Sequence, residues 1–355
     1  MSRHKRGRVR KCGSATDFPE IRCRVLLAGD VGGTKILLGL FRPAAARAGT
    51  ARPEQAVVRE YATLDFNSLD DVVRVFTEET NTTQIDAIVV GVAGPVQGHT
   101  ARLTNVPWVA DVSVVAERFD GCPALLLNDL EAMGSSVEVL DPDELAILQE
   151  GDAVPTGNGA LIAAGTGLGE ALLHNVDGRF VPAASEGGHA DFSPRTRREL
   201  ALVDELTRIN GRVSAEQVIS GQGIVNLFRF THGSQDLAKA CRVVRETDPV
   251  ELPARITASA MERRCEQCVE TLEMFVEAYG AEAGNLALRT VALAGVYIGG
   301  GIAPKILPAL EHGRFIDAFC SKEPMTDLLL TLPVHVILNP SAGLLGAAVR
   351  AAQIR

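Results

Sequence analysis

The chain has no long hydrophobic run and no framework of paired cysteines. None of its apolar stretches approaches the roughly 18 residues that a membrane-spanning helix needs, so we expect no membrane association. Its seven cysteines are odd in number and scattered, unlike the pattern of a disulfide-rich secreted domain. This cysteine pattern fits a reducing compartment, and we predict a cytoplasmic protein.

Basic charge is scarce outside the first residues. The net charge is −9, yet residues 1–24 carry eight Lys or Arg against Asp17 and Glu20. The rest of the chain is therefore acidic and offers no nucleic-acid face. The basic segment, residues 1–23, also lacks the apolar core of a secretory signal. We interpret it as a disordered extension or the product of an early start codon; a nucleic-acid-binding or organelle-targeting arm is the alternative.

Apolar runs alternate with helical patterns in the first half of the sequence. Strands are predicted at 24–29, 35–41, 56–61, 87–92 and 124–127, and helices at 68–80 and 111–119. This alternation predicts an α/β fold. The chain is long enough for two domains. Residues 141–158 are rich in turn-forming residues and are the expected boundary.

The second half is predicted to be more helical. Its longest helix, about 255–279, would align one apolar stripe at spacings of three and four residues: Met261, Cys265, Cys268, Leu272, Phe275 and Tyr279. We interpret Cys265 and Cys268 as structural. Metal or redox chemistry is the weaker alternative, because no second Cys or His pair at ligand spacing accompanies them.

A tight glycine turn lies between two apolar runs near the start of the fold. It reads Asp30-Val-Gly32-Gly33-Thr34-Lys35. Its backbone N–H groups can approach an anion closely, and the carboxylate can hold a metal or a metal-bound water. It is not a Walker loop, because a strand pattern continues where a helix should open. A simple hairpin turn is the alternative.

Two more glycine clusters follow later in the chain. Residues 159–173 repeat the strand-turn-strand plan around Gly165-Thr166-Gly167, which suggests two related halves facing one nucleotide. Gly299-Gly300-Gly301 ends a strand-like run at 291–298 and would let an adenine or ribose lie flat on the backbone. A dinucleotide fingerprint is the alternative for residues 165–169. It fails because Glu170 occupies the last glycine position and a strand follows.

Polar side chains accompany these turns. Asn128 and Asp129 follow the strand at 124–127, where a carboxylate could take a proton from an attacking hydroxyl; a helix cap is the alternative. Glu186 and His189 stand in the glycine-containing loop 185–192 and suit hydroxyl recognition better than metal binding. Glu216 follows the predicted cap Ser214 and could merely favour a helix dipole.

Together these motifs, with Thr104-Asn105-Val-Pro-Trp108 and Gly343-Leu-Leu-Gly346, resemble bacterial glucokinases of the non-ROK type. This family belongs to the hexokinase and actin-like ATPase superfamily. The resemblance implies a two-domain actin-like ATPase (ribonuclease H-like) fold with the active site in the interdomain cleft. The small α/β domain would comprise 24–140 plus 340–355, with a helix at 342–352 packing back on it, and the large α/β domain 141–339. The zinc-type cysteine cluster of ROK kinases is missing.

The resemblance also implies roles for individual residues. Asp129 would be the catalytic base for the 6-hydroxyl of D-glucose. The sugar would be bound by six side chains: Asn105, Asn128, Asp129, Glu186, His189 and Glu216. The cofactors would be ATP and Mg²⁺. The ATP phosphates would lie at Asp30, Gly32, Gly33, Thr34, Gly165, Thr166 and Gly167, and the adenosine at Gly299, Gly300 and Gly301. No side chain is assigned as a direct metal ligand, although Asp30 could hold Mg²⁺ through water.

Other functions stay open at this point. A hexokinase with another sugar or donor fits the same motifs, and so does a non-enzymatic sugar-responsive regulator of the same fold. The intact Asp129 and the lack of a helix-turn-helix extension argue against the regulator. A homodimer is compatible with the sequence. Lys35 replaces an asparagine that several family members have after the Gly-Gly-Thr turn.

Overall fold

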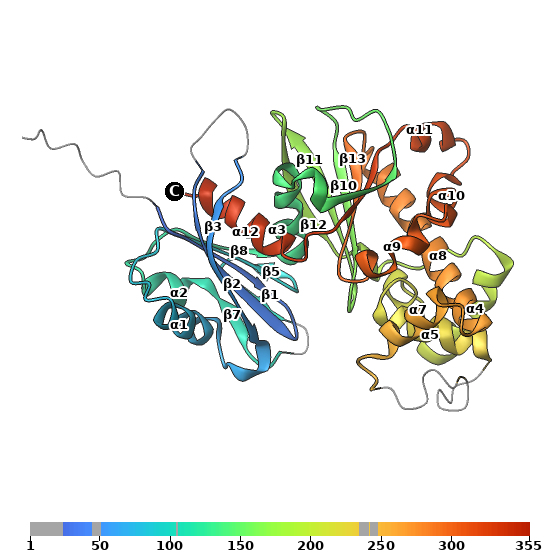
Figure 1. The fold of residues 1–355 in the computed structure, drawn as a ribbon, viewed down its shortest axis with the longest axis horizontal. Coiled ribbons are helices and arrows are strands. Elements are labelled where there is room, and N and C mark those ends of the chain that lie inside the picture. Colours follow the sequence, from blue (N-terminus) through green and yellow to red (C-terminus); the bar gives the residue numbers. More distant parts are fainter. Residues whose placement is uncertain (1–23, 45–50, 104–105, 234–240, 242–247) are drawn as a thin grey trace, which may run out of the picture.

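The structure is a computed structural model that describes residues 24–44, 51–103, 106–233, 241 and 248–355. The predicted basic extension, 1–23, and the predicted sugar ligand Asn105 lie outside the described residues. Two mixed β-sheets form the centre of the molecule, each covered by helices (Figure 1). Within the described ranges, no helix has the length and apolarity that a bilayer crossing requires.

The first sheet has the strand order β3-β2-β1-β4-β8. Its strands are β1 (Leu26–Val31), β2 (Lys35–Arg42), β3 (Glu54–Ala62), β4 (Ala87–Val92) and β8 (Ala124–Asn128). β1 is antiparallel to β2 and parallel to β4, which is parallel to β8. Helices α1 (Leu69–Glu79) and α2 (Val112–Glu117) pack on one face through a continuous apolar cluster. All five strands were predicted, and β1, β2, β4 and β8 are apolar runs bounded by polar or turn residues.

The second sheet has the order β12-β11-β10-β13-β14-β9. Its strands are β9 (Leu145–Gln149), β10 (Gly159–Ala164), β11 (Leu168–Val176), β12 (Arg179–Ser185), β13 (Gly295–Gly299) and β14 (Val334–Ile337). As in the first sheet, a central strand, here β10, is antiparallel to the next strand in sequence and parallel to a later one. The predicted relation between two halves is therefore visible in the topology. β9 was not predicted, because it lies in the turn-rich segment 141–158.

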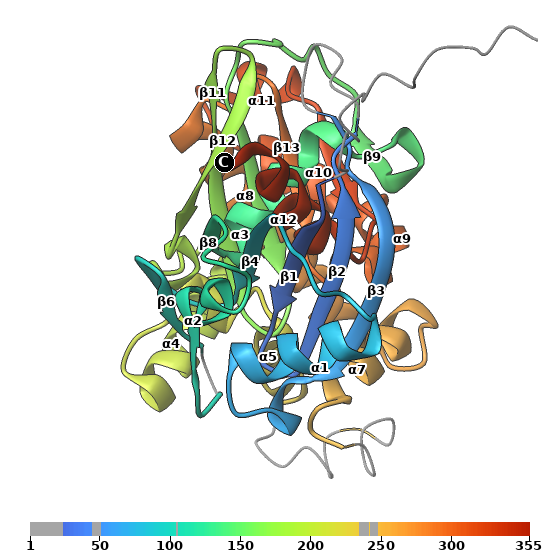
Figure 2. The ribbon, with the colours of Figure 1, turned by 90° about the vertical axis from the view of Figure 1, so that its left-hand side faces the viewer.

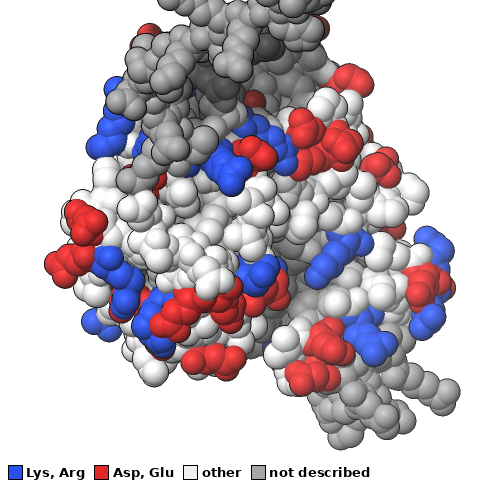
Figure 3. Space-filling view, turned by 60° about the vertical axis from the view of Figure 1, so that its left-hand side comes forward, with Lys and Arg blue, Asp and Glu red and all other residues white. Residues whose placement is uncertain are grey.

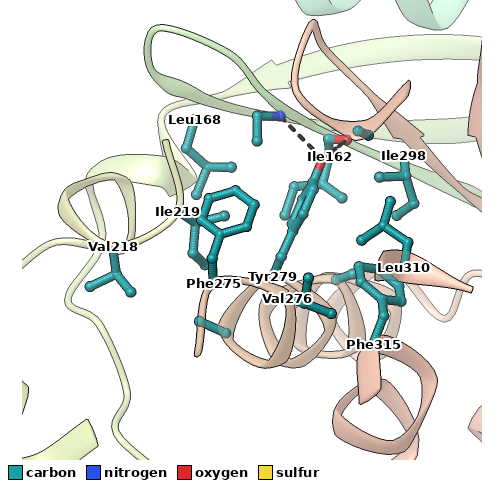
Figure 4. Close-up of a cluster of buried hydrophobic side chains, with 14 of the residues drawn as sticks. Ile162, Leu168, Val218, Ile219, Phe275, Val276, Tyr279, Ile298, Leu310 and Phe315 are labelled. Carbon is teal, nitrogen blue, oxygen red and sulfur yellow. Dashed lines mark hydrogen bonds between the residues drawn. The ribbon is translucent and has the colours of Figure 1, made fainter. Parts of the chain in front are cut away.

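A large apolar core lies between the second sheet and its helices. These are α4 (Arg197–Asn210), α5 (Gly221–His232), α7 (Leu252–Met261), α8 (Glu266–Thr290), α9 (Leu307–Leu310), α10 (Arg314–Cys320) and α11 (Thr326–Leu330). Phe275 and Tyr279 of α8 are fully buried between Ile162 of β10 and Phe315 of α10 (Figure 4). The predicted apolar stripe is thus correct along α8.

The single helix predicted at 255–279 is wrong. The chain forms α7 and α8, separated by a reversal in which Arg263 has a left-handed φ of 53° and Cys265 is extended. Met261 is 40% exposed and does not belong to the stripe, whereas Cys268 is buried. The strand predicted at 291–298 is also too long. Val291 is the left-handed C-cap of α8, and β13 begins only at Gly295.

The chain ends on the first sheet. Helix α12 (Ala342–Gln353) packs on β1, β4 and α3 (Asp129–Ser136) through Leu344, Ala347 and Ala351. Helix α3 also contacts β11 and β12, so it joins the two halves (Figures 1 and 2). The predicted contact of the terminal helix with the first half is present. The domain limits at 140 and 340 stay a prediction.

Three short strands, β5 (Val96–Gln97), β6 (Thr100–Arg102) and β7 (Val109–Asp111), form a small antiparallel sheet beside the first one.

On the face drawn in Figure 3, acidic and basic side chains are interspersed around an uncharged area. That face presents no field of a single sign.

Candidate active site

Asp129 is the first residue of α3, directly after β8. The helix cap is provided by Asn128, whose side-chain oxygen accepts a hydrogen bond from Leu130 N at 2.9 Å. Glu131 completes a capping box by accepting from the backbone N–H of Asn128 at 3.1 Å. The Asp129 carboxylate also accepts from Leu130 N, at 3.0 Å. Capping therefore does not account for Asp129, because Asn128 already fills that role.

The environment of Asp129 disfavours its charged form. Burial, and next the negative charge of Asp30, raise its pKa to about 6; Glu186 adds to the effect, and two backbone hydrogen bonds oppose it. A carboxyl with a pKa near neutrality suits proton transfer. The charges that act on Asp129 thus come from both halves, Asp30 from the first and Glu186 from the second.

The first glycine turn is held by its own hairpin and by Thr63. Gly32 N donates to Lys35 O at 2.9 Å, and the Thr63 hydroxyl donates to Gly32 O at 2.9 Å. Gly33 and Thr34 are exposed at the tip. Burial raises the pKa of Asp30, and the charge of Lys35 lowers it. A side chain at Gly343 of α12 would press against the Asp30 carboxylate, so the terminal helix comes close to this turn only because of that glycine.

The second glycine turn is fixed by Glu216. Gly165 N donates to Gly167 O at 2.8 Å, and Leu168 N donates to Oε2 of Glu216 at 2.9 Å. A Cβ on Gly167 would collide with that carboxylate. The helix predicted to start at Ser214 is only a 3₁₀ turn, Ala215–Gln217, and α5 begins later at Gly221. Glu216 therefore has a definite hydrogen-bonding role beyond favouring a helix dipole.

Three predicted sugar-binding side chains come together. Nε2 of His189 lies 3.8 Å from Oε2 of Glu186, and its Nδ1 lies 3.9 Å from Oε1 of Glu216. These gaps exceed a hydrogen bond, so both nitrogens and both oxygens keep capacity for a ligand. Glu186 and His189 are exposed, with 66% and 61% of their side-chain surface accessible.

The loop that carries Glu186 and His189 depends on its two glycines. A Cβ on Gly187 would collide with Glu170, and one on Gly188 with the carbonyl of Leu168. Arg212, which the sequence did not single out, donates to the carbonyl of His189 and to Asp191 Oδ1. It positions the loop rather than facing a ligand. Its only sequence signal is a basic residue shortly before Ser214.

Glu170 was also missed as part of the site. It is buried beneath the loop, and its pKa is raised to about 7, first by burial and then by Glu282, while Arg289 opposes the shift. Its Oε1 has no hydrogen-bond partner among the described residues. A carboxylate within the apolar run 168–173 was the available signal.

The third glycine cluster lies beside the second turn. Gly300 has a φ of 83°, and a Cβ there would collide with the carbonyl of Ala164. The Tyr279 hydroxyl accepts from Ala164 N at 3.1 Å and lies 3.3 Å from the oxygens of Ile162 and Gly299 (Figure 4). It therefore joins the ends of β10 and β13. Gly301 is exposed, with no atom near its missing side chain.

A cavity of about 500 Å³ lies elsewhere, at Phe41, Arg52 and Glu144. Arg52 donates to Glu144 Oε2 there at 2.6 Å. None of the predicted site residues lines this cavity. Of the predicted sugar ligands, the structure brings Asn128, Asp129, Glu186, His189 and Glu216 to one region, whereas Asn105 lies outside the described residues.

Comparison with known proteins agrees with this architecture. A glucokinase of Nostoc punctiforme is 38% identical over 345 residues, covering 93% of this chain and 99% of its own. The crystal structure of a glucokinase from an Antarctic psychrotroph matches with a TM-score of 0.79 at 28% identity, and the match covers 93% of this chain and 99% of that one. A ROK family glucokinase from Streptomyces griseus, solved with glucose and AMPPNP, shares the fold with a TM-score of 0.61 at 20% identity. This match covers 93% of this chain and 99% of that one.

The topology and the match to a solved glucokinase define a sugar kinase with the actin-like ATPase fold. Residues 27–354 match the glucokinase family. The chain belongs to that family, whose members are ATP-dependent hexose kinases.

Proposed function

We propose that this chain transfers the γ-phosphoryl group of ATP to the 6-hydroxyl of D-glucose, giving glucose 6-phosphate and ADP. The observation that carries the proposal is the Asp129 carboxyl, which starts α3 at the carboxyl end of β8 with a pKa of about 6. It is not needed as the helix cap, and the negative charges of Asp30 and Glu186 both raise its pKa.

The sugar site is assigned to Asn128, Glu186, His189 and Glu216, with Asn105 added from the sequence. Two carboxylates flanking an imidazole at 3.8 and 3.9 Å leave donors and acceptors for hydroxyl groups between them. Asn128 has less freedom. Its oxygen caps α3, and its amide lies 3.4 Å from Gly94 O, so one N–H remains for a ligand.

The nucleotide site is assigned to the three glycine clusters. Gly32, Gly33, Thr34, Gly165, Thr166 and Gly167 would hold the phosphates, and Gly299, Gly300 and Gly301 the adenosine. Exposed turn backbone at Gly33, Thr34 and Thr166 suits an anion. The single carboxylate of Asp30 fits Mg²⁺, which keeps several waters and binds through one or two carboxylates plus phosphate oxygens. When bound, Mg²⁺ would neutralise phosphate charge.

The chemical step needs little from the protein beyond alignment and one proton acceptor. Asp129 takes the proton of the 6-hydroxyl as this oxygen bonds to the γ-phosphorus. The bond from that phosphorus to the bridging oxygen breaks, and ADP leaves with the electron pair. Because the pKa of Asp129 is about 6, most of it is ionised and able to accept a proton at pH 7 to 8.

A coupled assay that crosses several hexoses with ATP, ADP and polyphosphate tests the substrate assignment. We expect the highest kcat/KM for glucose with ATP. Asp129→Asn should lower kcat by roughly 10²- to 10⁴-fold while changing glucose affinity far less. Asp120→Asn is the matched control, because Asp120 is exposed and its φ of 55° suits asparagine. A higher kcat/KM with another sugar or donor would show that the assigned substrates are wrong. Normal turnover of Asp129→Asn would show that Asp129 is not the catalytic base.

A further inference from the structure

Three cysteines and one histidine meet in the second half of the molecule, away from the assigned catalytic residues. One ligand atom each of His232, Cys241, Cys265 and Cys268 lies within 4.8 Å of all the others. We propose that these four side chains bind a structural zinc ion. The cluster differs from the assigned Mg²⁺ position in both residues and ligand chemistry.

The spacing of the ligand atoms fits tetrahedral zinc. Zn–S bonds of about 2.3 Å and Zn–N bonds of about 2.0 to 2.1 Å at a tetrahedral angle put the ligand atoms roughly 3.5 to 3.8 Å apart. Sγ of Cys265 lies 3.4 Å from Nε2 of His232. The cluster needs only small side-chain adjustments to enclose an ion.

The histidine is oriented for metal binding. Nδ1 of His232 lies 2.8 Å from the carbonyl oxygen of Phe228, one turn earlier in α5. A carbonyl can only accept, so this contact places the proton on Nδ1 and leaves the lone pair of Nε2 facing Cys265. Metal-bound histidines commonly have such a backbone partner on the other ring nitrogen.

The ligand set favours zinc among the common ions. Thiolates and imidazole select zinc over Mg²⁺ or Ca²⁺, which prefer oxygen. Four protein ligands fill a tetrahedral shell, so no position stays open for a substrate, and the site would be structural. Cys268 is fully buried, and the other three are partly buried. The Cys-x-x-Cys pair at Cys265 and Cys268 is a frequent half of such sites.

The position of the cluster indicates what the ion would hold. His232 is the last residue of α5, Cys265 immediately precedes α8 and Cys268 lies in the first turn of α8, while Cys241 lies between α5 and α7 in the sequence. Zinc would thus tie Cys241 and the end of α5 to the reversal between α7 and α8. At its other end, α5 approaches the second glycine turn, because Gly221 N donates to Gly165 O at 2.8 Å.

Metal analysis of the purified full-length protein tests the proposal. We expect roughly one zinc per chain when no chelator is used during purification. The double variant Cys265→Ser/Cys268→Ser should lose the metal. Cys320→Ser is the matched control, since Cys320 is buried in the same half but outside the cluster. Cys122→Ser is a second control in the first half.

A second measurement keeps the test decisive if the double variant does not fold. Wild-type protein stripped by a chelator under reducing conditions should lose thermal stability and regain it when zinc is returned, because binding energy at a structural site is folding energy. Cobalt in place of zinc should give the intense visible bands of a tetrahedral thiolate site. The proposal is overturned if reduced wild type neither contains nor takes up zinc. It is also overturned if the double variant keeps the metal, or if a disulfide joins two of these cysteines.

Discussion

The carboxylate of Glu216 accepts a hydrogen bond from Leu168 N at 2.9 Å, and its other oxygen lies 3.9 Å from Nδ1 of His189. One side chain therefore connects the glycine turn assigned to the phosphates with the loop assigned to the sugar. The two substrate sites share a support. A substitution in the glycine turn that moves Glu216 should accordingly change kcat/KM for glucose.

Gly167→Ala tests this link. The added Cβ would collide with Oε2 of Glu216 and displace it. Losing a hydrogen bond to a charged group costs about 1.5 to 3 kcal/mol, so we expect kcat/KM for glucose to fall at least roughly tenfold. Gly165→Ala is the matched control, because no atom lies within 4 Å of its missing Cβ. With ATP saturating, Gly165→Ala should affect glucose much less. Equal glucose defects in both variants would contradict the role of Glu216.

Asp129 should make stability depend on pH. Its pKa is raised from 3.8 to about 6 by burial and then by Asp30, so ionisation is harder in the folded state than in the unfolded state. Below pH 3.8 both states are protonated and the shift has no effect on stability. Above pH 6 the folded protein carries an unfavourable charge worth about 1 to 3 kcal/mol.

We therefore expect Asp129→Asn to melt at a higher temperature than wild type at pH 8, and the gain to disappear as the pH falls from 6 towards 4. Thermal unfolding at a series of pH values measures this, with Asp120→Asn as the control that should show no such trend. In wild type, kcat/KM should fall on the acidic side with a midpoint near pH 6, the pKa of Asp129. A stability gain of equal size at every pH would mean that packing, not charge, distinguishes the variant.

Tyr279→Phe should destabilise the second half. The change removes the hydroxyl that accepts from Ala164 N, leaving a buried N–H without an acceptor at a cost of about 1 to 3 kcal/mol. Urea denaturation measures the free energy of unfolding. Tyr297→Phe is the control, because Tyr297 also lies in this half, on β13, and stacks on His335 without taking part in the contacts to Ala164, Ile162 and Gly299. Losses of equal size in both variants would show that the bridge between β10 and β13 contributes little.

The sequence was sufficient where one local signal decides a structure. β1, β2, β4 and β8 lie within two residues of their predicted limits, because each apolar run ends at residues that a strand excludes. The helix across 255–279 was wrong because apolar spacing continued through the reversal at Arg263. Periodicity reports which face is buried and is insensitive to a single residue that changes the chain direction.

Contacts between distant residues were beyond local signals. The residue types of Glu186, His189 and Glu216 suggested hydroxyl binding, but their proximity depends on the bridge between Asp191 and Ser214. Only the resemblance to a family predicted that these three side chains belong to one site. The cluster of His232, Cys241, Cys265 and Cys268 was not predicted. His232 and Cys241 precede Cys268 by 36 and 27 residues, which is not a familiar metal-binding spacing.

Glu186 and His189 should decide which hexoses are accepted. A site built to pair with a hydroxyl leaves its own polar groups unsatisfied when that hydroxyl is missing or inverted, at about 1 to 3 kcal/mol for each lost pairing. Wild type should therefore prefer glucose strongly over its epimers. Glu186→Ala and His189→Ala should each lose at least roughly tenfold in kcat/KM for glucose and much less for an epimer. Measuring kcat/KM for glucose and one epimer in wild type, in both variants and in the exposed control His174→Ala separates the effects. Equal losses on both sugars would show that Glu186 and His189 shape the loop or position the phosphates, and their role in sugar recognition would have to be withdrawn.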